Sequence, residues 1–145
     1  MRIRQSPLHR TPAALLLGLV WVFSACAADR GGQDPAELER LRVDLAARAD
    51  ATPEHLLAGK GVFDATCVSC HGPAGGGSIL GPPLAHEFYK PSHHADIAFL
   101  FAIQRGVRAH HWRFGDMPAV EGVDQQQAEQ VVAYIRWLQQ GVGIE

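Results

Sequence analysis

The chain has 145 residues, of which 47% are hydrophobic and 19% charged, enough to bury one compact core but not two sizeable ones. Its formal net charge is −2 and its basic residues are scattered, which excludes the usual electrostatic signature of a nucleic-acid-binding protein. Of the three cysteines, Cys67 and Cys70 form a close pair and Cys26 stands alone. We therefore expect the pair and the single cysteine to have different roles.

Residues 1–25 have the pattern of an export signal. Arg2, Arg4 and Arg10 precede an apolar run over 13–23, and small residues follow. The run is about half of the roughly 20 residues that span a bilayer, so a permanent transmembrane helix is the weaker interpretation. We predict a signal peptide over 1–25 that is removed from the mature protein.

Cys26 follows this signal directly. The stretch Phe23-Ser24-Ala25-Cys26 resembles the lipobox of bacterial lipoproteins, although Phe23 stands where leucine is usual. The resemblance implies that Cys26 is lipidated and anchors the protein on the periplasmic side of a bacterial membrane, inner or outer. The alternative is an ordinary secretory signal in which Cys26 has no role.

Residues 26–51 are predicted to form the anchored tether, in which a short helix can form. Asp34 is a capping residue, Pro35 suits the first helical position, and Glu37 is a carboxylate three residues after the cap. Leu38, Leu41 and Leu45 then fall on one face. We favour a spacer helix that packs on the following domain over a docking surface for a partner subunit.

Residues 52–145 are predicted to form a single all-α domain with three main helices. The first spans about 53–65, and the second spans about 95–105, where the strongly apolar sequence predicts that the helix is largely buried. The third follows Asp124, which Gln127 can complete as a capping box, and runs to about Gly141. The intervening loop is rich in glycine and proline and shows no strand-like alternation, so no sheet is expected.

The strongest motif is Cys67-Val68-Ser69-Cys70-His71, the attachment pattern of c-type haem. Two thiols about one turn apart can add to the two vinyl groups of one macrocycle, and the adjacent histidine can coordinate the iron. A thiol redox pair would need a βαβ context, and a zinc site would need two more ligands at short spacing. Neither context is present in the sequence, so we predict one covalent haem c held by Cys67, Cys70 and His71.

Beyond this motif, the sequence resembles the class I cytochrome c family over nearly all of residues 53–141. Gly59 and Phe63 precede Cys67 as the family's glycine and aromatic do, and Tyr134 on the last helix is similar to their usual partner. The resemblance implies a small cytochrome c fold, with loops wrapped around the haem. The stretch Gly81-Pro82-Pro83-Leu84 is similar to the family's Gly-Pro-x-Leu loop, which implies that the carbonyl of Pro82 accepts a hydrogen bond from the imidazole of His71.

Met117 is the predicted sixth ligand of the iron. It stands beside Pro118 just before the last helix, as the family's axial methionine commonly does, and the other methionine, Met1, lies in the signal. A His/Met pair leaves no open iron position, which suits electron transfer rather than ligand activation. The alternative role of Met117 is to fill the core.

His110 and His111 depart from the family pattern. They could replace Met117 on the iron, or join other histidines in an extra metal site; the others are His86, His93 and His94. We favour a third role, in which they cover the haem edge or bond a propionate. In that arrangement Trp112 and Phe114 pack on the macrocycle, and Arg108 or Arg113 offsets its charge.

These features predict a membrane-tethered electron carrier rather than an enzyme, with redox proteins or oxidoreductase subunits as partners and no small-molecule substrate. Two alternatives stay open. One is a haem subunit of a larger oxidoreductase. The other is a sensor or enzyme that binds a small ligand if Met117 does not bind the iron.

Overall fold

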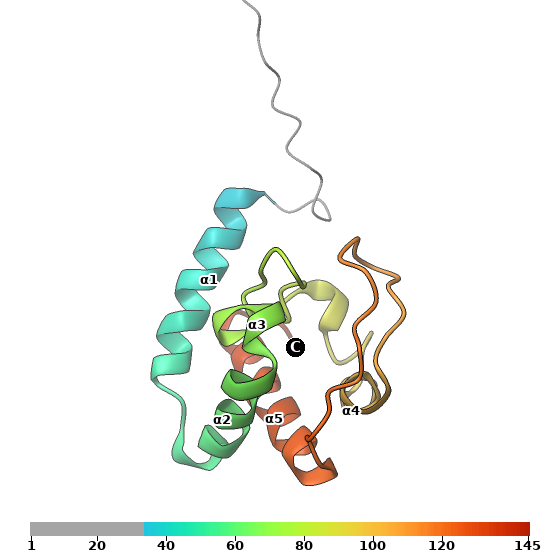
Figure 1. Cartoon of the computed structure of the whole chain (residues 1–145). Helices are drawn as coiled ribbons and strands as arrows, with labels where there is room; N and C mark the ends of the chain where they lie inside the picture. The colour runs from blue at the N-terminus through green and yellow to red at the C-terminus, as the bar shows by residue number, and fades with distance from the viewer. Residues whose placement is uncertain (1–33) are drawn as a thin grey trace, which may run out of the picture.

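The computed structural model describes residues 34–145. The predicted signal peptide, Cys26 and the first part of the predicted tether lie outside the described residues. The described part contains five α-helices and three short 3-10 segments (Figure 1). In chain order they are α1 (Pro35–Asp50), η1 (Glu54–Leu56), α2 (Leu57–Thr66), α3 (Val68–His71), η2 (Pro73–Gly75), η3 (Glu87–Tyr89), α4 (Asp96–Arg105) and α5 (Gln125–Gly141).

The predicted all-α fold is confirmed. Within residues 34–145 the β-structure is limited to one isolated antiparallel bridge between Val107 and Met117. The three predicted main helices correspond to α2, α4 and α5, and α1 is the helix expected after Asp34. The structure adds the four-residue α3. No helix in this part of the chain is both long and apolar enough to cross a membrane.

The centre of the fold is the crossing of α2 and α5. At Gly59 the two backbones approach so closely that a Cβ would lie 2.0 Å from the carbonyl oxygen of Gln130. One turn later Phe63 packs against Tyr134 with their ring centroids 5.7 Å apart, and both side chains are fully buried. This crossing fixes the direction in which α2 leads the chain into Cys67.

α1 packs on the rest of the molecule (Figure 1), as the favoured spacer-helix interpretation requires. Asp34 caps it by accepting a hydrogen bond from the Ala36 N–H, and Leu45 is fully buried in the same core as Phe63. Arg48 donates from Nε to the carbonyl of Trp137 on α5 at 2.7 Å. The helix is therefore part of the folded unit that carries the haem-binding motif.

α4 is less buried than its composition predicted. Phe99 and Ile103 are buried, whereas Ile97 is 52% exposed and Phe101 is 42% exposed. The reason is that α4 packs on α5 through one face only. Phe101 lies on the side of α4 that borders the cavity described below.

α5 begins as predicted. The side chain of Asp124 accepts from the Gln127 N–H, and the side chain of Gln127 accepts from the Asp124 N–H, which completes the capping box. Both groups satisfy donors that the first turn of a helix otherwise leaves without partners. The fixed start of α5 holds the end of the loop that carries Met117.

Candidate functional site

The Cys-x-x-Cys-His motif forms its own short helix. Cys67 ends α2, its N–H donating to the carbonyl of Phe63 at 2.8 Å, and α3 continues from Val68 to His71. Cys67 borders a cavity, and burial raises the pKa of its thiol. Cys70 is exposed and lies outside the cavity wall. The two thiols are thus one helical turn apart, with only Cys67 facing the cavity.

His71 is held in one orientation by Pro82. Its Nδ1 lies 3.0 Å from the carbonyl oxygen of Pro82, which is the contact that the family resemblance implies. His71 is 8% exposed, and burial lowers its pKa while the Pro82 hydrogen bond opposes that shift. Because Nδ1 donates its proton to this carbonyl, the other ring nitrogen, Nε2, has a free lone pair for a metal.

Met117 is positioned by a bridge at the base of a loop. The N–H of Val107 donates to the Met117 carbonyl at 2.8 Å, and the N–H of Met117 donates back at 2.9 Å. Gly106 allows this close approach: its φ is +76°, and a Cβ there would lie 2.5 Å from the Met117 carbonyl oxygen. The loop 108–116 therefore leaves and returns at one point, and Met117 faces the cavity that Cys67 and His71 border.

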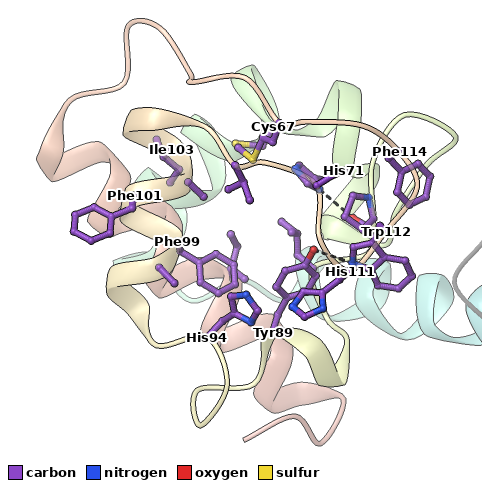
Figure 2. A pocket seen from close by; sticks show the side chains of 18 of the residues that line it. Cys67, His71, Tyr89, His94, Phe99, Phe101, Ile103, His111, Trp112 and Phe114 are labelled. Atoms are coloured by element: carbon purple, nitrogen blue, oxygen red, sulfur yellow. Dashed lines mark hydrogen bonds between the residues drawn. The ribbon is translucent and has the colours of Figure 1, made fainter.

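The cavity has a volume of about 380 Å³ and lies between α3, α4, α5 and the loops, and this volume is within the range of about 300–1,000 Å³ that is usual for ligand pockets. Most of its wall is apolar, from Leu84, Ala98, Phe99, Phe101, Ala102, Ile103, Val107, Val131 and Ile135 among others. Figure 2 shows Cys67 and His71 near one another on this wall. An imidazole, a thioether and a cysteine on an apolar wall fit a covalently attached haem whose iron has two protein ligands.

Tyr89 and Arg136 support the cavity, and no pattern in the sequence marks either residue. The indole N–H of Trp112 donates to the Tyr89 hydroxyl at 3.0 Å (Figure 2), and burial raises the pKa of Tyr89 to about 12. Arg136 donates from Nη1 to the Tyr89 carbonyl at 2.6 Å and from Nε to Asp96 Oδ1 at 2.7 Å. In the sequence, Arg136 stands on the polar edge of an amphipathic helix, where an arginine looks the same as an ordinary solvent-exposed charge.

The aromatic and basic loop only partly matches the expectation drawn from its composition. Trp112 and Phe114 line the cavity, as their proposed packing on a macrocycle requires. Arg108 and Arg113 are exposed and do not line it. The structure therefore places neither arginine on the cavity wall, to which this loop contributes aromatic and histidine side chains.

The histidines of the loops gather beside the cavity. His94, His110 and His111 line it, whereas His93 is exposed. Burial, with positive neighbours, lowers the pKa values of His94 and His111. His86 is separate: its Nδ1 accepts from the Phe88 N–H at 3.1 Å, and its ring packs on Trp112.

Comparison with known proteins identifies a family. A family model described as Cytochrome c matches residues 56–139 of the chain, from the start of α2 to the last turn of α5. Searches of curated proteins and of solved structures found no significant match. The matched range contains every residue that lines the cavity.

Proposed function

The chain belongs to the cytochrome c family, and on that premise we propose that it is a membrane-tethered, extracytoplasmic electron carrier whose single haem iron is bound by His71 and Met117. The family carries covalently attached haem c, and when bound this group supplies one-electron chemistry at its iron. The chain's own residues hold the group, orient its ligands and exclude water.

Each residue has a distinct part in the proposal. Cys67 and Cys70 bind the macrocycle through thioether bonds, and His71 supplies Nε2 to the iron because Nδ1 is engaged by Pro82. Met117 supplies a soft thioether, which favours reduced iron and raises the potential. Two protein ligands leave no open position, so the site suits electron transfer better than small-ligand binding.

One observation carries the proposal. Cys67, His71 and Met117 come from different segments of the chain, and all three lie on the wall of one apolar cavity. The bridge between Val107 and Met117 fixes the backbone of the methionine at the edge of that cavity, so its presence there follows from backbone hydrogen bonding as well as from side-chain packing.

Visible spectroscopy and redox titration of the purified full-length protein test this assignment. We expect one reversible one-electron transition, the weak far-red band of methionine–iron ligation in the oxidised state, and no spectral shift when carbon monoxide is added to the reduced protein. A carbon monoxide shift together with a missing far-red band would favour a ligand-binding sensor instead.

The membrane tether is proposed from the sequence around Cys26. The basic residues, the apolar run and the small residues before Cys26 are typical of an exported lipoprotein. Intact mass of the mature protein would report cleavage and acylation together. We expect Cys26→Ala to release the protein from the membrane fraction with an unchanged haem spectrum; retention of the variant in membranes would contradict the lipid anchor.

A further inference from the structure

Three histidines from two separate loops converge at the edge of the cavity. His93 and His94 precede α4, and His111 belongs to the loop closed by the Val107–Met117 bridge. Each offers a ring nitrogen, and the three nitrogens lie within 4.8 Å of one another. We propose that these three imidazoles form a second metal site, which binds one zinc ion and joins the two loops.

The spacing of the nitrogens suits zinc. Nε2 of His93 and Nε2 of His111 are 3.3 Å apart. Two nitrogens at about 2.0–2.1 Å from a tetrahedral zinc ion lie about 3.3–3.4 Å apart, so this pair already has the length of a tetrahedral edge. Three histidines and an open fourth position are an established zinc ligand set, and imidazole is a preferred ligand of this metal.

His94 is held as a metal ligand should be. Its Nδ1 donates to the carbonyl of Phe88, which leaves Nε2 as the nitrogen with a free lone pair. Its own carbonyl accepts from Nη2 of Arg136 on α5, so the backbone at this position is tied to the core of the fold. Metal-binding histidines almost always have such an outer partner, which fixes the tautomer and the ring orientation.

The site has a consequence for Met117. His111 is six residues before Met117, within the loop whose base is the bridge from Val107. Joining His111 to His93 and His94 would pin that loop to the start of α4 and restrict its opening. The inference does not require Met117 to be an iron ligand, but it does require that His93, His94 and His111 are not, because each imidazole must have a free nitrogen for the zinc ion.

The test is calorimetric titration of zinc sulfate into the chelator-treated full-length haem protein. We expect one zinc ion per chain and an upward shift of Tm on binding. His93→Ala, which alters an exposed side chain, and His111→Ala should each weaken binding by more than the roughly 10–100-fold that loss of an outer-shell partner costs. The matched control His55→Ala, an exposed histidine on η1, should bind zinc like the parent protein.

Three results would overturn the inference. One is the absence of stoichiometric binding. Another is equal affinity in His93→Ala and the parent, in which case the 3.3 Å contact is a shared proton. The third is a change of the haem spectrum during the titration that reports loss of an axial ligand, because it would assign these imidazoles to the iron. Repeating the titration on Met117→Ala distinguishes this result from failure of the Met117 assignment.

Discussion

Gly59 on α2 lies against the main chain of α5 so closely that a Cβ at this position would come 2.0 Å from the carbonyl oxygen of Gln130. Because the obstacle is backbone and not a movable side chain, Gly59→Ala must separate the two helices. We expect Gly59→Ala to lower the free energy of unfolding by about 1–3 kcal/mol or more, as substitutions that overpack a core do.

Gly61, two residues further along the same helix, is the matched control. Apart from its chain neighbours and the backbone of its own helix, no described atom lies within 4 Å of a Cβ built there. Alanine is more favourable than glycine in a helix interior by about 0.5–1 kcal/mol. The midpoint of chemical denaturation of the haem protein should therefore fall for Gly59→Ala and rise for Gly61→Ala. Equal effects of the two substitutions would show that the crossing is looser than described.

Leu45 tests whether α1 belongs to the folded unit. Its side chain is fully buried, so Leu45→Ala should destabilise the protein by about 2–5 kcal/mol, as core leucine truncations do. Val43 on the same helix is 61% exposed, and Val43→Ala should change stability by no more than about 0.5 kcal/mol. If α1 were a detached tether, thermal denaturation would not separate the two variants.

The main helices were predictable because their signals are local. α2, α4 and α5 have apolar periodicity, and α5 also has a capping box between Asp124 and Gln127, all of which can be read within a few residues. α3 was missed because four residues are too short for a periodic pattern. The exposure of Phe101 was missed because periodicity identifies an apolar face but does not tell which part of it borders a cavity.

The residues of the site were likewise predictable only where the signal is local. Cys67, Cys70 and His71 are adjacent in the sequence, so the motif alone predicts them. Arg136 is 47 positions from Tyr89 along the chain, and nothing local marks the pairing. The convergence of His93 with His111, 18 positions apart, likewise depends on how two loops fold over α4, which composition does not encode.

Arg136 should be the most important charged side chain in the described part of the fold. Only 12% of its side chain is exposed, and it donates to the carbonyls of Tyr89 and His94. Lysine keeps the charge but cannot make the forked contact, so we expect Arg136→Lys to cost about 1.5–3 kcal/mol, the worth of one charged hydrogen bond.

Hydrogen exchange should show faster opening over residues 87–96 in Arg136→Lys. The control is Arg105→Lys, since Arg105 lies over the ring of Phe101 at 4.3 Å and lysine can also make that contact. A large loss of stability in the control, or unchanged exchange in Arg136→Lys, would contradict this role of the guanidinium.

His86 should make stability depend on pH. Burial lowers its pKa below 6.5, with Glu87 and Glu37 opposing the shift, and its Nδ1 must be unprotonated to accept from the Phe88 N–H. The unfolded chain therefore takes up a proton first as pH falls. The stabilisation is complete above about pH 6.5 and is lost on acidification.

His86→Asn provides the comparison, because an asparagine oxygen can accept the same backbone hydrogen bond without titrating. Denaturation measured from about pH 7 to about pH 5 should show a smaller loss for His86→Asn than for the parent. The difference should be a few tenths to about 1 kcal/mol, the net value of one hydrogen bond. Parallel pH profiles would mean that His86 is not the group responsible.

Met117 is the most direct test of the proposed iron ligation. Met117→Ala should abolish the far-red band of the oxidised protein and allow carbon monoxide to bind the reduced protein, because no second thioether is present after the predicted cleavage of the signal. Met117→His should restore a strong second ligand and exclude carbon monoxide. It should also lower the potential, within the range of about 0.8 V over which axial ligands set haem potentials.

Phe114→Leu serves as the control, because Phe114 lines the same cavity from the same loop but cannot ligate iron. It should retain the far-red band even if it lowers stability. Should the band survive in Met117→Ala instead, another side chain binds the iron, and the nearby candidates are His94, His110 and His111, which also line the cavity. A low reduction potential of the parent protein would also indicate a histidine ligand, because imidazole is a harder ligand than thioether and favours oxidised iron.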